Sequence, residues 1–201
     1  MALDFDGTDD RVDHGDIAAI DGASVLTVAF WINVDTLEAS GGIIGKGTDP
    51  TGYYLYEGAS NKLRCATNRS ATFGSSGTAL ATGAWHHWGI VFDGAGAANA
   101  DRLKMYYDGT AETLTFAGTI PATLPDSGAA VLYTGFTTAE AGVYYDCKLA
   151  HVKIWTAALT ADEVTQEMNG YRPVRTANLV LWFPYDDGTK AVDYSGNGNH
   201  G

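Results

Sequence analysis

The sequence predicts an all-β fold, in which antiparallel strands form a sandwich or a barrel, together with one short helix. Short apolar runs rich in Val, Ile, Thr, Tyr, Phe and Trp recur along the chain, and these residue types suit a pleated, half-buried surface. Turn sequences such as "DGTDD" and "YDGTAE" separate the runs. Strands and helices do not alternate as they do in an α/β fold. With no linker-like segment in between, we expect residues 1–201 to form a single domain.

The expected strands follow the apolar runs in chain order. They lie near residues 2–6, 11–14, 25–34, 42–46, 52–58, 62–67, 85–92, 102–107, 112–117, 129–135, 145–155 and 179–185. The segment 93–101, "DGAGAANAD", predicts a long hairpin loop rather than a linker.

One helix is expected in "ALTADEVTQEMNGY". Thr160 followed three residues later by Glu163 is a capping box, which satisfies the first free N–H groups of a helix. Val164 and Met168 share one helix face because they lie four residues apart. Gly170 suits the C-terminal cap.

Charge and composition exclude several partners. The formal net charge is −12, and the 12 Lys and Arg residues form no cluster, so we expect binding neither to nucleic acid nor to anionic membranes. The N-terminus has no basic segment followed by an apolar one, so we expect no signal peptide and synthesis in the cytoplasm. Cys65 and Cys147 could pair, but two buried, reduced thiols are favoured.

The stretch "WHHWGIVFDG" raises the question of a metal or catalytic histidine. In a strand, successive side chains point to opposite faces, so His86 and His87 cannot bind one metal together. Both faces of residues 85–92 are apolar, which predicts an inner strand.

Several motifs occur in a recognisable order. They are "LDFDGTDDRVD", "VAFWINVDT", "IIGKG", "WHHWGIVFDG", "LKMYYDG", "VKIWTAALTADEV" and "LVLWFPYDDGTKAVDYSGNGNHG". Across nearly the whole chain, this order resembles the laminin-G-like, concanavalin-A-like lectin/glucanase jelly-roll family. The resemblance implies two packed antiparallel sheets of six or seven strands each, and a non-catalytic module that binds glycans or proteins. Ala150 and His151 stand where members often carry an acidic pair.

Enzymes on this fold that cut polysaccharides resemble one another in a strand that carries E-x-D-x-E. Retaining hydrolysis needs two carboxylates about 5–5.5 Å apart. The chain has six glutamates, and the only close pair, Glu163 and Glu167, lies in the expected helix. We therefore predict no catalytic residue and no enzymatic activity.

A calcium site is one hypothesis for "DYSGNGNHG". Asp193, Ser195 and Asn197 place oxygen ligands at positions 1, 3 and 5, and Gly198 suits the sharp turn at position 6, as at the start of a calcium loop. The resemblance also implies calcium, because some members carry a structural ion. The alternative is a tight Asx-rich turn without metal.

Aromatic residues give a second candidate site, for a glycan. Tyr54 and Tyr56 share one strand face, and Phe73 lies in the polar segment "SATFGSSGT", which we expect to be a loop. The alternative is that these rings belong to the core.

Two functions are compatible with these features. The first is a non-catalytic surface or assembly component, such as a phage virion decoration or adhesion protein, with a glycan, protein surface, capsid or tail protein as partner. The alternative is a free-standing carbohydrate-binding (lectin-like) module. We expect a homo-oligomer or part of a larger assembly, with the first strand, near Leu3, close to the last, near Leu181.

Overall fold

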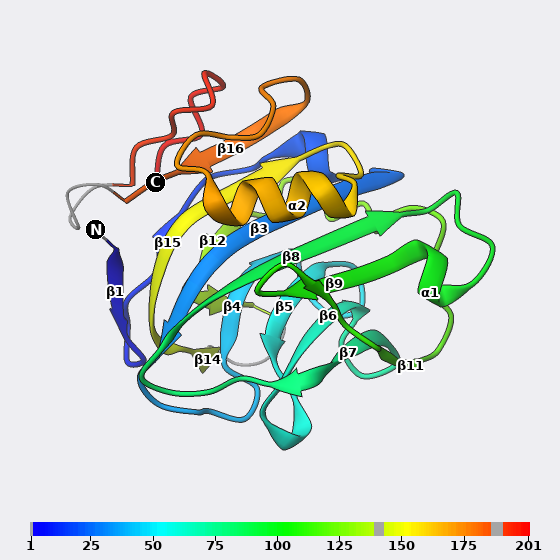
Figure 1. Ribbon diagram of the computed structural model, residues 1–201, viewed down its shortest axis with the longest axis horizontal. Helices are drawn as coiled ribbons and strands as arrows, with labels where there is room; N and C mark the ends of the chain where they lie inside the picture. Colours follow the sequence, from blue (N-terminus) through cyan, green and yellow to red (C-terminus); the bar gives the residue numbers. More distant parts are fainter. Residues whose placement is uncertain (1, 139–142, 186–190) are drawn as a thin grey trace.

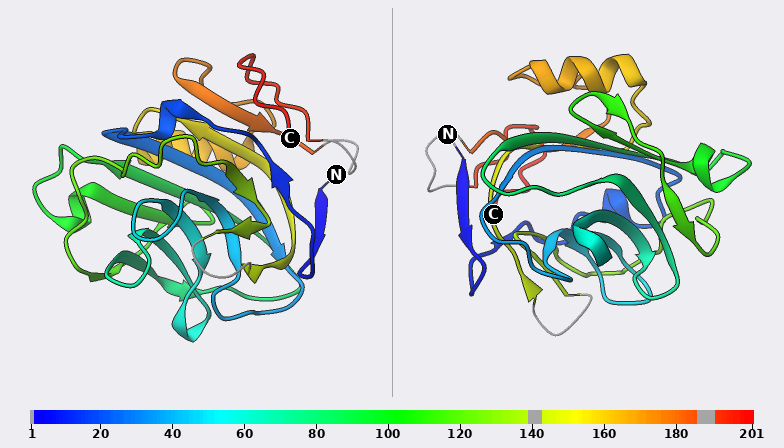
Figure 2. Two further views of the ribbon diagram at one scale, coloured as in Figure 1. Left: turned by 180° about the vertical axis from the view of Figure 1, so that it is seen from behind. Right: turned by 60° about the horizontal axis from the view of Figure 1, so that its bottom comes forward.

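The computed structural model describes residues 2–138, 143–185 and 191–201. Two large antiparallel sheets pack face to face as a β-sandwich, which confirms the predicted fold class (Figures 1 and 2). The strand order of the first sheet is β1-β15-β3-β8-β9-β10, and β16 also pairs with β15. The order of the second sheet is β11-β7-β6-β5-β4-β12-β2.

The strands of the first sheet are β1 (Leu3–Asp6), β3 (Val25–Val34), β8 (Trp85–Asp93), β9 (Leu103–Tyr107), β10 (Thr110–Ala111), β15 (Asp146–Trp155) and β16 (Leu179–Phe183). Those of the second are β2 (Val12–Asp13), β4 (Gly42–Lys46), β5 (Tyr53–Glu57), β6 (Lys62–Asn68), β7 (Thr72–Ala79), β11 (Thr115–Ala117) and β12 (Leu132–Thr134). The remaining elements are the hairpin β13 (Phe136–Thr137) and β14 (Val143–Tyr144), the helices α1 (Asn99–Arg102) and α2 (Ala161–Asn169), and the 3-10 turns η1 (Ala18–Ile20) and η2 (Ala59–Asn61).

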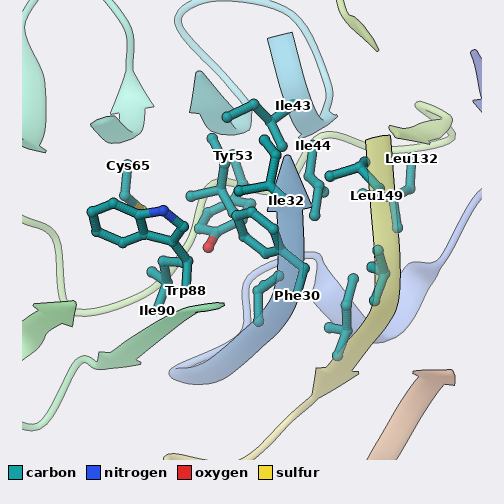
Figure 3. Packing of buried hydrophobic residues seen from close by; sticks show 14 of the residues in the cluster. Phe30, Ile32, Ile43, Ile44, Tyr53, Cys65, Trp88, Ile90, Leu132 and Leu149 are labelled. Carbon is teal, nitrogen blue, oxygen red and sulfur yellow. The ribbon is translucent and has the colours of Figure 1, made fainter. Parts of the chain in front are cut away.

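The core lies between the sheets and follows the period of two that strands impose. Figure 3 shows Phe30 and Trp88 of the first sheet pointing toward Tyr53 and Cys65 of the second. Cys65 and Cys147 are both buried and unpaired, as predicted. Tight packing of such large side chains from facing sheets stabilises a sandwich through burial of apolar surface.

The tryptophans divide between the two faces of the first sheet. Trp88 and Trp155 are both 0% exposed, the first in the main core and the second in the smaller cluster on the outer face. Trp31 and Trp182 are only partly buried, on the outer face of the sheet, where Trp182 packs against the smaller apolar cluster that includes Val164 of α2. An apolar run in the sequence does not tell which of its faces the core covers.

Helix α2 covers part of this outer face, where it lies across β3 and β8 (Figure 1). The predicted capping box is present: Glu163 N–H donates to Thr160 Oγ1 at 3.2 Å, and Thr160 N–H donates to Glu163 Oε2 at 2.8 Å. Val164 is buried against Gly89 of β8, where any Cβ would lie 2.5 Å from the valine. Gly170 caps the C-terminus as predicted, although with a φ of −104° that other residues also adopt.

Three segments differ from the sequence-based expectation. Residues 72–79, expected as a loop, form strand β7 between β6 and β11. The end of the expected loop at 93–101 belongs to the single turn of α1, so the described residues form two α-helices rather than one. Phe136, just beyond the strand expected near 129–135, lies in β13. In each case, pairing or packing with distant residues decides the structure over local propensity.

The adjacent histidines lie on opposite faces of β8, an inner strand between β3 and β9, as predicted. His86 Nδ1 lies within hydrogen-bond distance of Asp108 Oδ2, at 2.9 Å, and of the Tyr107 hydroxyl, at 2.7 Å. His87 is buried on the other face, beside Trp31. The first and last strands both pair with β15, at Leu149 and Ile154 respectively, so they lie close together as expected. No helix in the described part of the chain could span a membrane.

Candidate functional site

The outer face of the second sheet carries a small aromatic cluster. Tyr53 of β5 points into the main core, whereas Tyr54 and Tyr56 form a separate cluster with Ala66 of β6. Phe73 of β7 packs against the same cluster. The fold therefore brings the three predicted ligand-binding residues together, although Phe73 comes from a strand that the sequence did not predict.

Two arginines lie over these rings. Arg64 is the partner of Tyr56 across β5 and β6, and its guanidinium carbon lies 4.2 Å from the centroid of the Phe73 ring. The guanidinium carbon of Arg69 lies 4.3 Å from the centroid of the Tyr56 ring. At such distances, a cation is attracted to the electron-rich face of an aromatic ring. The two guanidinium groups thus place positive charge over the aromatic cluster.

A cavity of about 360 Å³ opens beside these side chains. Its size lies within the range of about 300–1,000 Å³ that is typical of small-molecule sites. Its walls come from the loops before β4 and β5, from β5 and β6 themselves, from the turn between these two strands, and from the turn between β6 and β7. The lining residues are Ala39, Ser40, Asp49, Tyr56, Gly58, Ala59, Arg64, Arg69 and Ser70.

Arg69 is held from several sides. Its backbone N–H donates to Asp49 Oδ1 at 2.7 Å, and its Nη2 donates to the carbonyl of Ser40 at 3.0 Å. The Tyr56 hydroxyl donates to the Arg69 carbonyl at 3.3 Å. Ser40 has a φ of +81°, a backbone conformation that residues other than glycine rarely adopt. Backbone strain of this kind often accompanies functional sites. These contacts fix the position of one cation at the cavity wall.

The electrostatics of the cavity favour a ligand with negative or strongly polar groups. Burial raises the pKa of Tyr54 well above its ordinary value; Asp49 adds to this shift and Arg69 opposes it. The phenol is therefore neutral at physiological pH. The lining residues then carry two guanidinium groups and one carboxylate, so this region has a local positive charge in a protein whose net charge is −12.

The predicted aromatic residues take different roles from those expected. Tyr54 is 0% exposed and Tyr56 is 3% exposed, so neither offers an open ring face to a sugar, because Arg69 and the neighbouring loops cover them. Phe73 is partly exposed and Tyr56 lines the cavity. That these residues bind a ligand stays a prediction.

Sequence reasoning missed Arg64, Arg69 and Asp49. The sequence did indicate Arg64, because Arg64 and Ala66 are two residues apart in β6 and therefore share one face, which is the face of Tyr54 and Tyr56. Asp49 and Arg69 are 20 residues apart, in two turns, and only the completed sheet brings them together.

The predicted calcium ligands form a hydrogen-bonded turn. Asp193 Oδ1 accepts from the backbone N–H of Trp182 at 3.0 Å and of Ser195 at 2.9 Å. Asp193 Oδ2 accepts from the Ser195 hydroxyl at 2.8 Å and from the Asn199 N–H at 3.0 Å. Both carboxylate oxygens are thus engaged by donors, and a cation would have to compete with them.

Asn197 also turns its amide group toward the protein. Its Nδ2 donates to the carbonyls of Leu179 at 2.8 Å and Val180 at 3.1 Å. It donates as well to Ser195 Oγ at 2.9 Å. Three side chains that calcium would need as oxygen ligands are therefore used to fasten this turn to β16. This arrangement does not fit a cation, and calcium binding here stays a prediction.

Among the described residues, Asp49 is the single acidic residue that lines the cavity, so no pair of carboxylates faces it. Glu57, at the end of β5, is buried and accepts hydrogen bonds from the Tyr145 hydroxyl at 2.7 Å and the Glu38 N–H at 2.9 Å. Glu163 and Glu167 lie in α2, on the other sheet. Glu140 lies outside the described residues.

Comparison with known proteins adds to this geometry. A family model described as the concanavalin A-like lectin/glucanases superfamily matches residues 6–165. A comparison with curated protein sequences finds no match.

Several solved structures share the fold. A "putative carbohydrate binding protein" from Bacteroides ovatus aligns over 98% of this chain and 56% of its own, with a TM-score of 0.74 and 20% identity. Domain 4 of the GH43 extracellular arabinanase AbnA from Geobacillus stearothermophilus, solved with arabinotriose, aligns over 84% of this chain and 81% of its own, with a TM-score of 0.56 and 16% identity. A heptameric SAP-like pentraxin from Limulus polyphemus aligns over 82% and 79%, with a TM-score of 0.55 and 18% identity. The chain spans little more than half of the Bacteroides protein, and these likenesses show the fold alone.

Proposed function

Because the chain belongs to the concanavalin A-like lectin/glucanases superfamily, we propose that it is a non-catalytic carbohydrate-binding module. The proposed binding site is the cavity on the outer face of the second sheet. The observation that carries the proposal is the combination of an aromatic floor with fixed polar groups around a cavity of sugar-binding size.

The chemistry of this cavity suits a sugar ring. The C–H face of a sugar packs against an apolar surface, which the exposed part of Phe73 supplies beside the cavity. Sugar hydroxyls donate and accept hydrogen bonds at the same time. Arginine is a pure donor and carboxylate a pure acceptor, so Arg64 and Asp49 complement the two roles of a hydroxyl.

The comparisons support this proposal at the level of the fold. The Bacteroides ovatus structure is described as a carbohydrate-binding protein, and the arabinanase domain was solved with a trisaccharide. Hydrolysis would need a second carboxylate facing Asp49, since glycosidases use a pair. A single acidic group in the lining favours binding without turnover.

A role as a surface or assembly component, such as virion decoration, is compatible with glycan binding, because an adhesion protein can attach through glycans. No contact among the described residues favours a capsid or tail protein as partner. That role stays a prediction beside the glycan-binding proposal.

A glycan array tests the proposal directly. We expect wild-type protein to bind at least one class of oligosaccharide and Phe73→Ala to weaken that binding at least tenfold. Trp85→Ala is the matched control, because Trp85 is a partly exposed ring on the opposite sheet, and it should bind like the wild type. No binding to any glycan, or equal loss in both variants, would contradict the proposal. Release of shorter products from a bound glycan would contradict its non-catalytic part.

A further inference from the structure

We infer that the cavity selects a sugar that carries one carboxylate, such as a hexuronate, and that Arg64 binds this carboxylate. The inference rests on the proposed glycan-binding function and specifies the class of glycan. Three observations carry it: the contacts of the Arg64 guanidinium, the space that Gly58 leaves for that side chain, and the net charge of the whole protein.

Arg64 is a charged group with an unused donor. Its Nε is buried and has no hydrogen-bond partner within the described part of the chain. Its guanidinium lies over Phe73, which holds the cation by its ring face but accepts no conventional hydrogen bond. Arginine stays protonated at any physiological pH, and a buried donor without an acceptor costs free energy. Because the Nε is buried beside Gly58, a ligand in the cavity would reach the guanidinium through its terminal nitrogens rather than through the Nε.

The neighbouring charged groups leave this role to Arg64. Asp49 accepts from the backbone N–H of Arg69 at 2.7 Å, and Arg69 donates to the Ser40 carbonyl at 3.0 Å. Asp49 and Arg69 thus hold the loops around the cavity. Arg64, which also lines the cavity, has no such contact from its Nε within the described residues.

Gly58 makes room for the arginine. A Cβ at this position would lie 2.3 Å from both Cδ and Nε of Arg64. Any other residue would therefore push the guanidinium away from its place over Phe73. The hairpin that carries Gly58 is closed by its N–H, which donates to the Lys62 carbonyl at 2.8 Å. The turn between β5 and β6 is thus shaped to hold Arg64 at the cavity.

A carboxylate fits this donor better than other groups do. The guanidinium is a planar fork that matches the two oxygens of a carboxylate, and such charge-assisted hydrogen bonds are about twice as strong as neutral ones. The net charge of −12 repels a polyanion over a distance, but a single carboxylate meets mainly the local positive charge of the cavity. An oligosaccharide with one acidic sugar is therefore favoured over a sulfated or polyuronic chain.

Calorimetric titration with matched ligands tests the inference. The ligands are a xylose oligomer that carries one glucuronate (aldotriouronic acid), its methyl ester and neutral xylotriose, with sialyllactose and lactose as a second acidic and neutral pair. We expect at least one acidic ligand to bind tenfold or more tightly than its neutral counterpart. Arg64→Gln should remove this preference, and Gly58→Ala should reduce it. Lys104→Gln is the control, because Lys104 is exposed on the first sheet.

The outcomes separate the inference from the proposed function. If acidic and neutral ligands bind equally and Arg64→Gln changes neither, the carboxylate preference is wrong while glycan binding stands. If none of these ligands binds at millimolar concentration, the inference is overturned, and the glycan array decides the proposed function independently. Melting curves of Arg64→Gln and of the charge-preserving Arg64→Lys establish that the variants are folded. A preference that survives Arg64→Gln in a folded protein also overturns the inference.

Discussion

Lys153 of β15 and Glu167 of α2 form an ion pair beneath the helix, where each side chain is 1% exposed. Glu167 Oε2 also accepts from the backbone N–H of Val174 at 2.8 Å. Burial lowers the pKa of Lys153 and raises that of Glu167, and each partner opposes the shift of the other. This pair fastens α2 and the segment after it to the first sheet.

Removing one partner should destabilise the protein strongly. Lys153→Met leaves Glu167 buried without its counter-charge, and such changes cost about 3–5 kcal/mol. The double variant Lys153→Met with Glu167→Leu should recover most of this loss, because it leaves no buried charge. Urea denaturation of the three proteins measures the effect. A single variant within about 1 kcal/mol of the wild type would mean that water reaches the pair.

Stability should fall as the pH drops from 7 to 5. Burial lowers the pKa of His14 to about 3 and that of His87 to about 4, from an ordinary value of 6.5; Lys153 adds to the second shift. The folded protein keeps both rings neutral, whereas the unfolded chain takes up protons below pH 6.5. The stabilisation is therefore complete above pH 6.5 and is lost toward the folded pKa values, at about 2 kcal/mol per histidine by pH 5.

Denaturation at pH 7, 6 and 5 checks this dependence. His14→Gln should lower the stability at pH 7, because it alters the contact of His14 with Thr134, yet show a smaller further loss toward pH 5. The same pH dependence in the wild type and in a His14→Gln, His87→Gln double variant would show that other groups cause the acid effect.

The turn at Asp193 should be stable without calcium. Its carboxylate accepts four hydrogen bonds from the protein, so Asp193→Ala should lower Tm whether or not calcium is present. A cation that binds only the folded state raises stability with its concentration. Melting curves with millimolar calcium and with a chelator separate the two hypotheses. Equal curves indicate a metal-free turn, and a calcium-dependent rise in Tm that Asp193→Ala abolishes would establish the predicted site.

Association with itself or with a larger particle stays a prediction, and the sheet edges limit how it could occur. β2, β10 and β11, at three edges, have only two or three residues each, and such short edges offer few unpaired backbone groups. β1 and β16 share the remaining edge along β15. We expect sedimentation velocity to show a species larger than the monomer, with an interface of at least about 1,000 Å². A monomer at every concentration would contradict self-association.

Much of the fold could be predicted from the sequence, because period-two patterns and turn residues act locally. β3 and β4 begin and end at the predicted residues, and the Thr160 cap starts α2 as expected. β7 could not be predicted, since "TFGSSGTA" has few strand-forming residues. Its Gly74 fits because a Cβ there would lie 2.6 Å from Leu103, a contact that only the packed sandwich reveals.

The candidate site shows the same division. The shared face of Tyr54 and Tyr56 follows from strand geometry alone, and both lie in one cluster. The cover that Arg69 gives Tyr56 could not be predicted, because Arg69 also reaches Ser40 across 29 residues of sequence. Contacts of this kind depend on how side chains from separate loops meet across the outer face of the sheet, and the sequence pattern of each strand alone does not predict them.

The most direct test of the central claim is an NMR titration of the ¹⁵N-labelled protein with the glycan that the array identifies. Saturable shifts of the backbone amides of Ser40, Gly58, Arg64, Arg69 and Ser70, with little change on the first sheet, would place the glycan in the cavity of the second sheet, as the account predicts. Shifts confined to the opposite face around Trp31 and Trp85, or no saturable shift at any ligand concentration, would contradict it.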